Sequence, residues 1–430
     1  MATAKQLITR IEAGEFDGVF GRLYAHDAAV IETQRKRYIQ TIQEFEECFG
    51  EGRDLRIYSA PGRTELGGNH TDHNNGVVMA AGVNLDIIAV VSKNDNNVIN
   101  FKSKGFGRID GIDLNRLEPV ESEPSHSAAL IRGVAAGVAK VGGKVGGFDA
   151  FSTSDVLRGS GLSSSAAFEM GMAAIWNGEY GCGLAPAELA KICQYAENTY
   201  FGKPSGLLDQ LTSAVGGIIF ADFAAPRTPK IEKLHADGLL PEGMFLCVTD
   251  TRGSHSELTG EFAAIRQEME QVAACFGKPL LGQVEEGAFW AALPALRSRC
   301  GDRAVLRAIH YFEENARTLA QRDALYAKQF PVFARLVKQS GQASFALCQN
   351  VYCTADVRHQ GLSVALALSQ SILEGTEGAW RMQGGGFAGT IQAYVPGRLL
   401  GRYHEAIERV FGQGSCYVLR LREQGAVRVI

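Results

Sequence analysis

The chain alternates between stretches in which apolar residues recur every three to four positions and short apolar runs bounded by Gly, Pro or Asn. The first pattern is typical of amphipathic helices and the second of strands. Helices are expected at residues 28–48, 126–141, 165–178, 186–201, 206–214, 256–275, 303–325, 360–374 and 399–411. Strands are expected at 55–59, 77–81, 85–91, 98–101, 217–222, 244–249, 380–383, 390–395 and 417–421. Pro61 and Gly62 are expected to end the first strand and open a polar loop from Arg63 to Asn75.

The order of these elements indicates the fold class. Strands and helices follow one another without a regular strand–helix–strand repeat, which predicts an α+β fold. A chain of 430 residues is long enough for two domains. The stretch from Ala224 to Pro229 contains two prolines, so we expect an N-terminal domain at 1–223 and a C-terminal domain at 224–430.

Composition excludes several classes of function. Hydrophobic residues make up 46% and charged residues 21%, as in ordinary globular proteins. The formal net charge of -4 provides no basic field for nucleic acid, and no apolar run approaches bilayer length. Nine cysteines without a Cys-x-x-Cys spacing predict reduced thiols. We therefore expect a soluble, cytoplasmic protein that binds small molecules, with a monomer favoured.

A Gly- and Ser-rich stretch precedes the helix expected at 165–178. Its candidate phosphate-binding residues are Gly159, Ser160, Gly161, Leu162, Ser163, Ser164, Ser165 and Ala166. Small residues let backbone N–H groups converge on an anion, and the positive end of the following helix dipole points to the same place. There is no Lys of the Walker type, so serine hydroxyls must provide the donors and any Mg²⁺ contact. A simple turn that caps the helix remains the alternative.

The segment from Arg63 to His73 is dense in hydrogen-bonding side chains. It contains a cation, two imidazoles, an amide and two carboxylates together with paired glycines. Such a loop suits a ligand with many hydroxyl groups, because carboxylates accept hydrogen bonds from vicinal hydroxyls. A metal site made of His70, Asp72 and His73 is one alternative, and a merely solvated loop is another.

A further glycine cluster, Gly384 to Gly389, matches Gly-x-Gly-x-x-Gly. The residues after it alternate as in a strand, so it is not a dinucleotide-binding fingerprint. We interpret it as a tight turn that lets the backbone approach a neighbour closely. Glu197 and Asp209 follow the Gly-Ser stretch, and phosphoryl transfer to an alcohol needs one acid for Mg²⁺ and another for the hydroxyl proton.

Three stretches in this order resemble the GHMP small-molecule kinases, and within them the galactokinases. Ala60-Pro61-Gly62-Arg63 with Gly68 to Asp72 resembles the signature loop, Gly159 to Ala167 the phosphate loop, and Gly384 to Gly389 the third glycine motif. The family also has a characteristic segment between the phosphate loop and the third glycine motif. It is similar to Tyr195 to Glu197 and Gly206 to Gln210 of this chain. The resemblance spans residues 55–395 and implies a two-domain fold with the active site between the domains.

The resemblance also implies roles for individual residues. Asp209 falls on the catalytic base and Arg63 on the arginine that stabilises the charged site. Ser165 and Glu197 fall on the Mg²⁺ ligands, and ATP lies on the phosphate loop. The implied sugar contacts are Asn69, His70, Asp72, Gly206, Asp209, Phe262, Gly385 and Gly386. The implied reaction is transfer of phosphate from ATP to the anomeric hydroxyl of galactose.

The chain departs from the galactokinase pattern at several positions. It has Asn69 where Glu is usual, Glu65 where Asn is usual, and His73 and Phe262 where Tyr is usual. The third motif reads Phe-Ala-Gly-Thr instead of Phe-Gly-Gly-Cys. The substrate is therefore galactose or another galactose-type sugar, such as galacturonate or N-acetylgalactosamine. A non-catalytic sensor of galactose and ATP is a third possibility. His73 either touches the substrate or holds the loop in shape.

Overall fold

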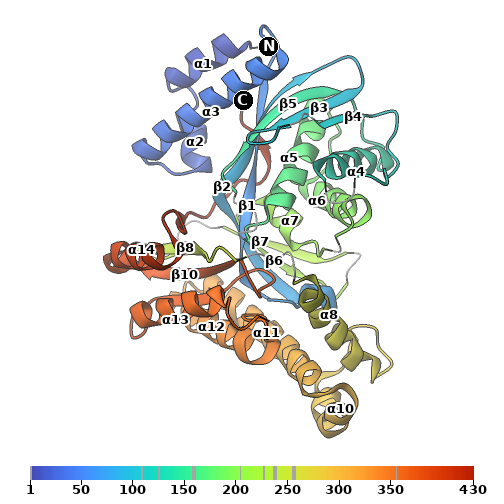
Figure 1. Cartoon of the computed structure of the whole chain (residues 1–430), viewed down its shortest axis with the longest axis vertical. Coiled ribbons are helices and arrows are strands. Elements are labelled where there is room, and N and C mark those ends of the chain that lie inside the picture. Colours follow the sequence, from blue (N-terminus) through green and yellow to red (C-terminus); the bar gives the residue numbers. More distant parts are fainter. Residues whose placement is uncertain are drawn as a thin grey trace.

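A computed structural model describes residues 2–107, 110–123, 126–156, 161–203, 205–225, 228–235, 240–253, 258–354 and 356–430. Gly159 and Ser160 of the expected phosphate loop lie outside these ranges. Strands of the described residues form an eight-stranded and a four-stranded sheet, and helices cover both (Figure 1). This mixed architecture confirms the α+β prediction.

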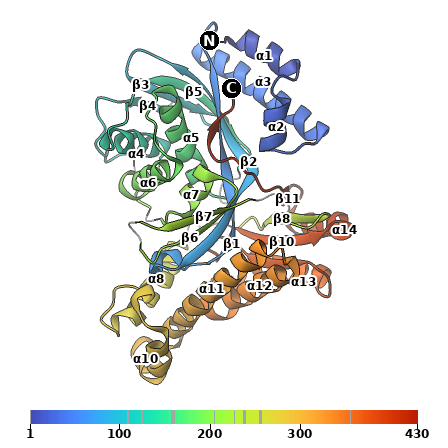
Figure 2. The same cartoon turned by 180° about the vertical axis from the view of Figure 1, so that it is seen from behind.

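The eight-stranded sheet is built around two long strands, β1 (Arg56–Gly67) and β2 (Val77–Lys93). Its main path runs β12-β1-β2-β5-β3-β4, and β6 pairs with β2 and β7. The bounds are β3 Val98–Ser103, β4 Asp110–Asp113, β5 Phe148–Ser154, β6 Ile218–Asp222, β7 Lys230–Leu234 and β12 Val427–Arg428. Figure 2 shows β1 and β2 extending from this sheet toward the helices of the other half of the molecule.

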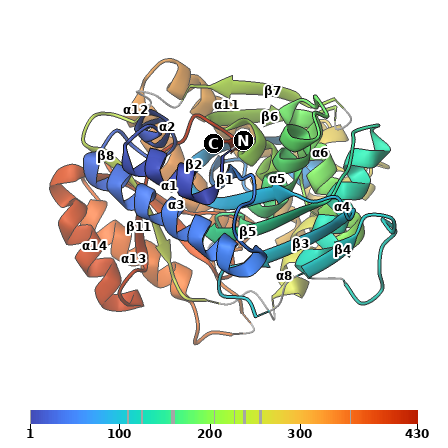
Figure 3. The same cartoon turned by 90° about the horizontal axis from the view of Figure 1, so that it is seen from above.

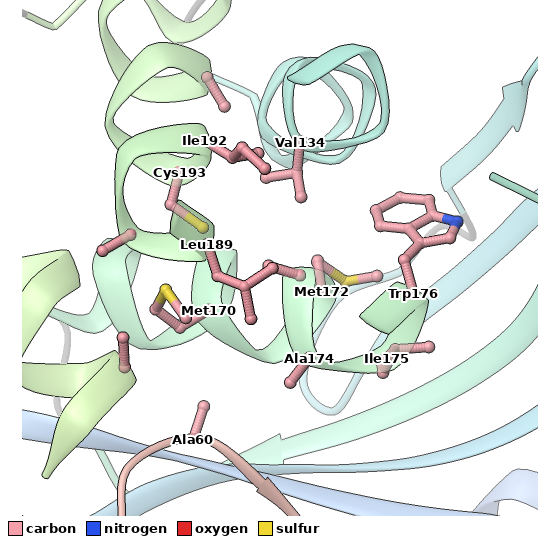
Figure 4. Close-up of a cluster of buried hydrophobic side chains, with 14 of the residues drawn as sticks. Ala60, Val134, Met170, Met172, Ala174, Ile175, Trp176, Leu189, Ile192 and Cys193 are labelled. Atoms are coloured by element: carbon pink, nitrogen blue, oxygen red, sulfur yellow. The ribbon is translucent and has the colours of Figure 1, made fainter. Parts of the chain in front are cut away.

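Opposite faces of this sheet bury different helices (Figure 3). One face packs against α4 (Ser127–Lys140), α5 (Ser164–Glu179), α6 (Pro186–Ala196) and α7 (Leu208–Val215). Figure 4 shows Met170, Met172 and Trp176 of α5 among Leu189, Ile192 and Cys193 of α6 and Val134 of α4. The other face packs against α1 (Ala4–Glu12), α2 (Asp17–Leu23) and α3 (Ala28–Phe49). Because strand residues alternate between faces, β1 contributes Tyr58 to the first core and Ile57 to the second.

The smaller sheet has the order β11-β8-β10-β9. Its strands are β8 Met244–Asp250, β9 Ala379–Met382, β10 Thr390–Pro396 and β11 Cys416–Leu419. The helices of this half are α8 Thr259–Ala274, α9 Glu286–Ala291, α10 Leu293–Cys300, α11 Asp302–Tyr326, α12 Phe330–Ala343, α13 Gly361–Leu373 and α14 Gly397–Phe411. Tyr394 of β10 packs with α12, while its neighbours Ala393 and Val395 pack with α13 and α14. The sheet is therefore covered on both faces.

Several elements differ from the sequence predictions. The predicted break at Pro61 and Gly62 is wrong, because β1 continues to Gly67 and absorbs the irregularity as register shifts at Pro61/Arg63 and Glu65/Gly67. The runs at 77–81 and 85–91 form one strand instead of two. Elements absent from the prediction are α1, α2, α9, α10, α12, β4, β5, β7 and β12. The division at 223/224 remains a prediction; β7 and β12 lie beyond it and pair with the larger sheet.

A buried ionic cluster joins β2 to the helical layer and to the C-terminal segment. Asp86 on β2 has 0% exposure and accepts hydrogen bonds from Arg37 of α3 (2.7 Å), Tyr24 (2.7 Å) and Arg422 near the C-terminus (3.0 Å). Burial alone would raise the pKa of Asp86, but the charges of Arg37 and Arg422 lower it below its usual value. Asp86 therefore stays ionised and connects three segments that are distant in sequence.

Replacing Asp86 with Ala should lower the free energy of unfolding by about 3–5 kcal/mol, because two buried guanidinium groups lose their counter-charge. Urea denaturation measures this loss. Asp95→Ala, in an exposed turn, is the matched control and should change stability by less than about 0.5 kcal/mol. Equal effects of the two substitutions would contradict a structural role for the cluster.

Candidate active site

Arg63 and Asp209 form the central ion pair of the site. The guanidinium donates from Nε to Oδ1 (2.7 Å) and from Nη2 to Oδ2 (2.8 Å) of Asp209. Arg63 lies on β1 between the two register shifts, and Asp209 lies in the first turn of α7. This bidentate geometry fixes both side chains, because a planar guanidinium matches a carboxylate at two points.

The same pair holds the end of the Gly-Ser loop. Arg63 donates from Nη1 to the carbonyl oxygen of Gly161, and its backbone N–H donates to that of Leu162 (3.1 Å). The Ser163 hydroxyl donates to Oδ2 of Asp209. Ser163 has a left-handed backbone with φ of 56° and directly precedes α5. The predicted phosphate loop therefore lies next to the predicted catalytic pair.

The pKa of Asp209 reflects two opposing effects. Burial alone would raise it, but the charge and hydrogen bonds of Arg63 and the hydroxyl of Ser163 lower it below its usual value. Asp209 is therefore ionised at neutral pH and is a strong hydrogen-bond acceptor. Its basicity in this state is low, so it is better suited to orient a hydroxyl than to remove a proton before bond formation.

A cleft of about 990 Å³ opens beside the N-terminus of α5. Ser164 and Ser165 line it at the helix end, and Phe101 and Phe168 line it with apolar rings. Lys104 is also among its lining residues. The unpaired N–H groups and dipole of a helix N-terminus favour an anion, and the aromatic wall favours a flat apolar group. The cleft therefore has the chemistry to bind a nucleotide.

Ser165 and Glu197, the predicted Mg²⁺ ligands, are hydrogen bonded to each other. The Ser165 hydroxyl donates to Oε1 of Glu197 at 3.1 Å. Lys203 donates to the same oxygen at 3.0 Å, and Gln210 donates to Oε2 at 2.8 Å. Glu197 begins a π-helical turn, Glu197–Phe201, which continues α6. The oxygen donors suit Mg²⁺, which prefers one or two protein ligands together with phosphates and water.

Within the described ranges, no group of three or more His, Cys, Asp or Glu side chains is arranged to hold a metal ion. A Mg²⁺ here would be held by the oxygens of Ser165 and Glu197 together with phosphate and water, beside Lys203. Sequence reasoning missed Lys203 and Gln210 as partners of Glu197. Gln210 directly follows Asp209, but no spacing signal points to Lys203.

His70 and His73 form a chain of hydrogen bonds. Nδ2 of Asn74 lies 2.9 Å from Nδ1 of His73, Nε2 of His73 lies 3.2 Å from Nδ1 of His70, and Nε2 of His70 lies 2.9 Å from the carbonyl oxygen of Gly385. Since the amide nitrogen of Asn74 can only donate and the carbonyl oxygen of Gly385 can only accept, this network assigns both histidines as neutral with the proton on Nε2. The metal-site alternative lacks support, because hydrogen bonds occupy every ring nitrogen.

Asp72 is near the catalytic pair but has a different environment. Burial and the negative charge of Asp209 raise the pKa of Asp72 to about 6, despite the backbone N–H of His73 that donates to Oδ1 at 2.9 Å. A Cβ atom on Gly206 would lie 2.0 Å from Oδ2 of Asp72. Gly206 is therefore required for the carboxylate to approach α7. The environments of Asp72 and Asp209 separate the pKa values of the two carboxyl groups.

Asn69, a predicted sugar contact, lies in the interior with 1% exposure. Its Nδ2 donates to the carbonyl oxygen of Gly384 (2.7 Å) and to Oε1 of Glu65 (3.2 Å), and its Oδ1 accepts from Asn350 (2.8 Å). Glu65 in turn pairs with the fully buried Arg381 of β9 at 2.6 Å. The structure thus gives Asn69 a role in joining the signature loop to the third glycine turn.

The third glycine motif is the turn between β9 and β10, as a tight turn was predicted. Gly386 has φ of 88°, and a Cβ atom there would lie 2.0 Å from the carbonyl oxygen of Asn350. A Cβ atom on Gly385 would lie 2.3 Å from Cε1 of Phe262. The turn therefore allows the close approach that the sequence predicts and brings Gly385 against the ring of Phe262.

Comparisons with known proteins agree with this geometry. Residues 43–93 match the galactokinase galactose-binding signature, and residues 129–217 match the N-terminal domain of GHMP kinases. A galactokinase of Streptomyces coelicolor is 30% identical over 383 residues, which cover 89% of this chain and 95% of the relative. A galactokinase of Actinobacillus pleuropneumoniae serotype 5b is 33% identical over 360 residues, or 82% and 88% of the two chains.

Solved structures share the fold. Galactokinase of Lactococcus lactis complexed with galactose superimposes with a TM-score of 0.79 at 22% identity, over 91% of this chain and 100% of that chain. Mevalonate kinase of Methanococcus jannaschii gives a TM-score of 0.62 at 15% identity, over 86% and 98%. None of the described helices is long and apolar enough to cross a lipid bilayer.

The histidine chain predicts a dependence of stability on pH. Burial lowers the pKa of His70 to about 4, below the 6.5 of an exposed histidine. At pH values between about 4 and 6.5, the unfolded chain binds more protons at His70 than the folded chain does. The free energy of unfolding is therefore highest above about pH 7 and falls as the pH decreases. From pH 7.5 to pH 5 the loss due to His70 should be about 2 kcal/mol.

Urea denaturation of the parent protein and of His70→Asn at both pH values measures this loss. The variant should lose about 2 kcal/mol less than the parent between the two pH values. His404→Asn, whose side chain is 40% exposed, should retain the pH dependence of the parent. An unchanged dependence in His70→Asn would show that His70 titrates normally in the folded state.

Proposed function

This chain belongs to the galactokinase family, and we propose that it transfers the γ-phosphoryl group of ATP to the anomeric hydroxyl of galactose. The observation that carries the proposal is the Arg63–Asp209 pair, which forms hydrogen bonds with Gly161 and Ser163 of the Gly-Ser loop. An ionised acceptor for a hydroxyl thus lies beside a phosphate-binding helix end. Transfer between two bound substrates needs this proximity.

The cleft beside α5 supports ATP as the phosphoryl donor. Ser164 and Ser165 would contact the phosphates at the helix N-terminus, and Phe101 and Phe168 supply apolar surface for the base. The signature loop supports a sugar as the acceptor. Asp72 has a carboxylate oxygen beside Gly206 and lies close enough to Asp209 for their charges to interact.

In the proposed mechanism, Asp209 accepts a hydrogen bond from the anomeric hydroxyl. This bond orients the hydroxyl oxygen toward the γ-phosphorus. Arg63 holds the carboxylate in position and compensates negative charge as it develops. The new O–P bond forms as the bond to the leaving ADP breaks, and the hydroxyl proton passes to Asp209. A loose transition state delays that proton transfer, so the low pKa of Asp209 is compatible with this role.

The oxygens of Ser165 and Glu197 would hold Mg²⁺, which neutralises phosphate charge when bound. The nine cysteines are free thiols, which supports a reducing compartment such as the cytoplasm. We further propose that the protein is a monomer and that its binding partners are small molecules.

Asp209→Asn should lower kcat about 10²- to 10⁴-fold, because the amide cannot accept the hydroxyl proton. Sugar affinity should fall far less than kcat, because Asp72 and the rest of the signature loop are unchanged, although the amide can accept only one of the two hydrogen bonds from Arg63. Coupled ADP release measures kcat, and calorimetric titration with galactose measures binding. Asp302→Asn is the matched control, because Arg297 contacts Asp302 in the same two-point geometry on the surface (2.7 and 3.2 Å).

The outcomes separate the proposal from its alternatives. Full activity of the Asp209 variant would exclude Asp209 as the proton acceptor. A parent protein that binds galactose and ATP but releases no ADP would be a sensor instead of a kinase. Turnover of N-acetylgalactosamine or galacturonate without turnover of galactose would assign a different acceptor to the same site.

Glu197→Gln should raise the Mg²⁺ concentration for half-maximal activity about tenfold or more, because the neutral amide is a weaker ligand. Ser165→Ala should raise it less, since a hydroxyl carries no charge. A Mg²⁺ titration of ADP release at saturating sugar measures both. Glu188→Gln, at the exposed start of α6, is the control and should leave the Mg²⁺ requirement unchanged. An unchanged requirement in Glu197→Gln would contradict its role as a ligand.

A further inference from the structure

Two thiols lie in contact where the ends of α8 and α10 meet. The sulfur atoms of Cys275 and Cys300 are 3.4 Å apart, and both residues are partly exposed to solvent. We propose that these cysteines are a redox-active pair, which a small disulfide such as glutathione disulfide converts reversibly into an intramolecular disulfide. The inference involves neither the sugar nor the nucleotide, so it does not depend on the proposed function.

The backbone at both cysteines leaves room for this bond to form. Cys275 caps the C-terminus of α8, and Cys300 is the last residue of α10, directly before Gly301 with φ of 84°. A disulfide holds its sulfur atoms about 2.0 Å apart, so the two must approach each other by about 1.4 Å. Helix ends can accommodate such a shift, because their last carbonyl groups are not held by intrahelical hydrogen bonds.

Contact and access together distinguish this pair from other cysteines of the chain. Cys247 and Cys416 also interact with each other, but they are 0% and 6% exposed on neighbouring strands of the smaller sheet. Cys182 is partly exposed, but its thiol donates to backbone carbonyl oxygens. Further buried thiols are Cys193, Cys348 and Cys353. A soluble oxidant can therefore reach a thiol with a second thiol beside it at the ends of α8 and α10.

The hydrogen bond between the two thiols indicates which one reacts first. Burial and the hydrogen bond with Cys275 raise the pKa of Cys300 to about 11, despite the nearby positive charge of Arg299. Cys300 therefore keeps its proton at neutral pH and can donate it to the sulfur of Cys275. Because a thiolate is the attacking species in disulfide exchange, we assign Cys275 as the first thiol to react and Cys300 as the second.

The oxidation consists of two successive exchanges. The thiolate of Cys275 attacks one sulfur of glutathione disulfide, which forms a mixed disulfide and releases one glutathione thiolate. Cys300 then gives its proton to water, attacks Sγ of Cys275 and releases the second glutathione thiolate. Overall, the two protein thiols lose two electrons and two protons, and one glutathione disulfide gains them to become two glutathione molecules.

The disulfide would fasten a helix that borders the signature loop. The sulfur of Met269 on α8 accepts a hydrogen bond from Nδ2 of Asn74 at 3.4 Å. Glu268 on the same helix pairs with Arg307 of α11 at 2.9 Å. Figure 1 shows α10 at the end of the molecule that is remote from both termini. The bond joins positions 25 residues apart, which restricts the unfolded chain and thereby stabilises the folded α8–α10 region.

Non-reducing peptide mapping of the full-length protein tests the proposal. The protein is incubated with millimolar glutathione disulfide, its free thiols are alkylated in denaturant, and the digest is analysed by mass spectrometry. We expect a linked peptide pair that contains Cys275 and Cys300 and that disappears after treatment with dithiothreitol. Cys247 and Cys416 should remain alkylated, because they are buried. Alkylation or separate glutathionylation of both Cys275 and Cys300 would overturn the proposal.

A variant without the second thiol tests the order of the two exchanges. In Cys300→Ser, glutathione should accumulate on Cys275 to a level about tenfold or more above that in the parent, because no neighbouring thiol resolves the mixed disulfide. Cys182→Ser is the matched control and should form the Cys275–Cys300 disulfide to the same extent as the parent. Absence of glutathione from Cys275 in a Cys300→Ser protein with parental melting temperature would overturn Cys275 as the attacking thiol.

Thermal unfolding measures the effect of the bond on the fold. The oxidised parent should melt about 2 °C or more above the reduced parent, because the crosslink restricts the unfolded chain. Oxidised and reduced Cys300→Ser should differ by less than this. An oxidised parent that contains the disulfide but melts no higher than the reduced parent would contradict the stabilising effect.

Discussion

The site depends on the two-point ion pair between Arg63 and Asp209. It joins the irregular part of β1 to the first turn of α7, and through Gly161 and Ser163 it also positions the end of the Gly-Ser loop. One guanidinium thus sets the distance between the Gly-Ser loop and the carboxylate of Asp209. Because Arg63 is itself buried, the pair has little freedom to rearrange.

Hydrophobic packing makes this pair possible. α5 begins at the Gly-Ser loop and is anchored along its length by Met170, Met172 and Trp176 between the large sheet and α6 (Figure 4). On the opposite face, Asp86 of β2 forms ion pairs with Arg37 of α3 and with Arg422 of the C-terminal segment. The sheet that carries Arg63 is therefore fixed from both sides, so the polar groups of the site are held on a rigid support.

Electrostatics divides the polar residues into two groups. Asp209 and Asp72 form one group, with pKa values pushed in opposite directions by Arg63 and by burial. Glu65, Asn69, His70 and His73 instead hydrogen bond to one another or to backbone across the two sheets. The signature loop consequently connects the two halves of the molecule.

The sequence alone determined the fold class and the family, because glycine clusters and their order along the chain reflect local backbone needs. It also predicted Arg63 and Asp209 as a catalytic pair, and the structure brings these two side chains together. It also predicted the glycine turn at 384–389, since left-handed backbone and close approach are properties of single residues. Only the tertiary structure decided that β1 continues past Pro61, that Lys203 and Gln210 contact Glu197, and that Asn69 faces the interior. The strand continuation and the position of Asn69 depend on pairing between distant segments, such as Glu65 with Arg381. Lys203 and Gln210 lie only 6 and 13 residues from Glu197, and the way the chain folds back decides their contacts. No local pattern records such a contact, because burial and partner choice are set by packing of the whole chain.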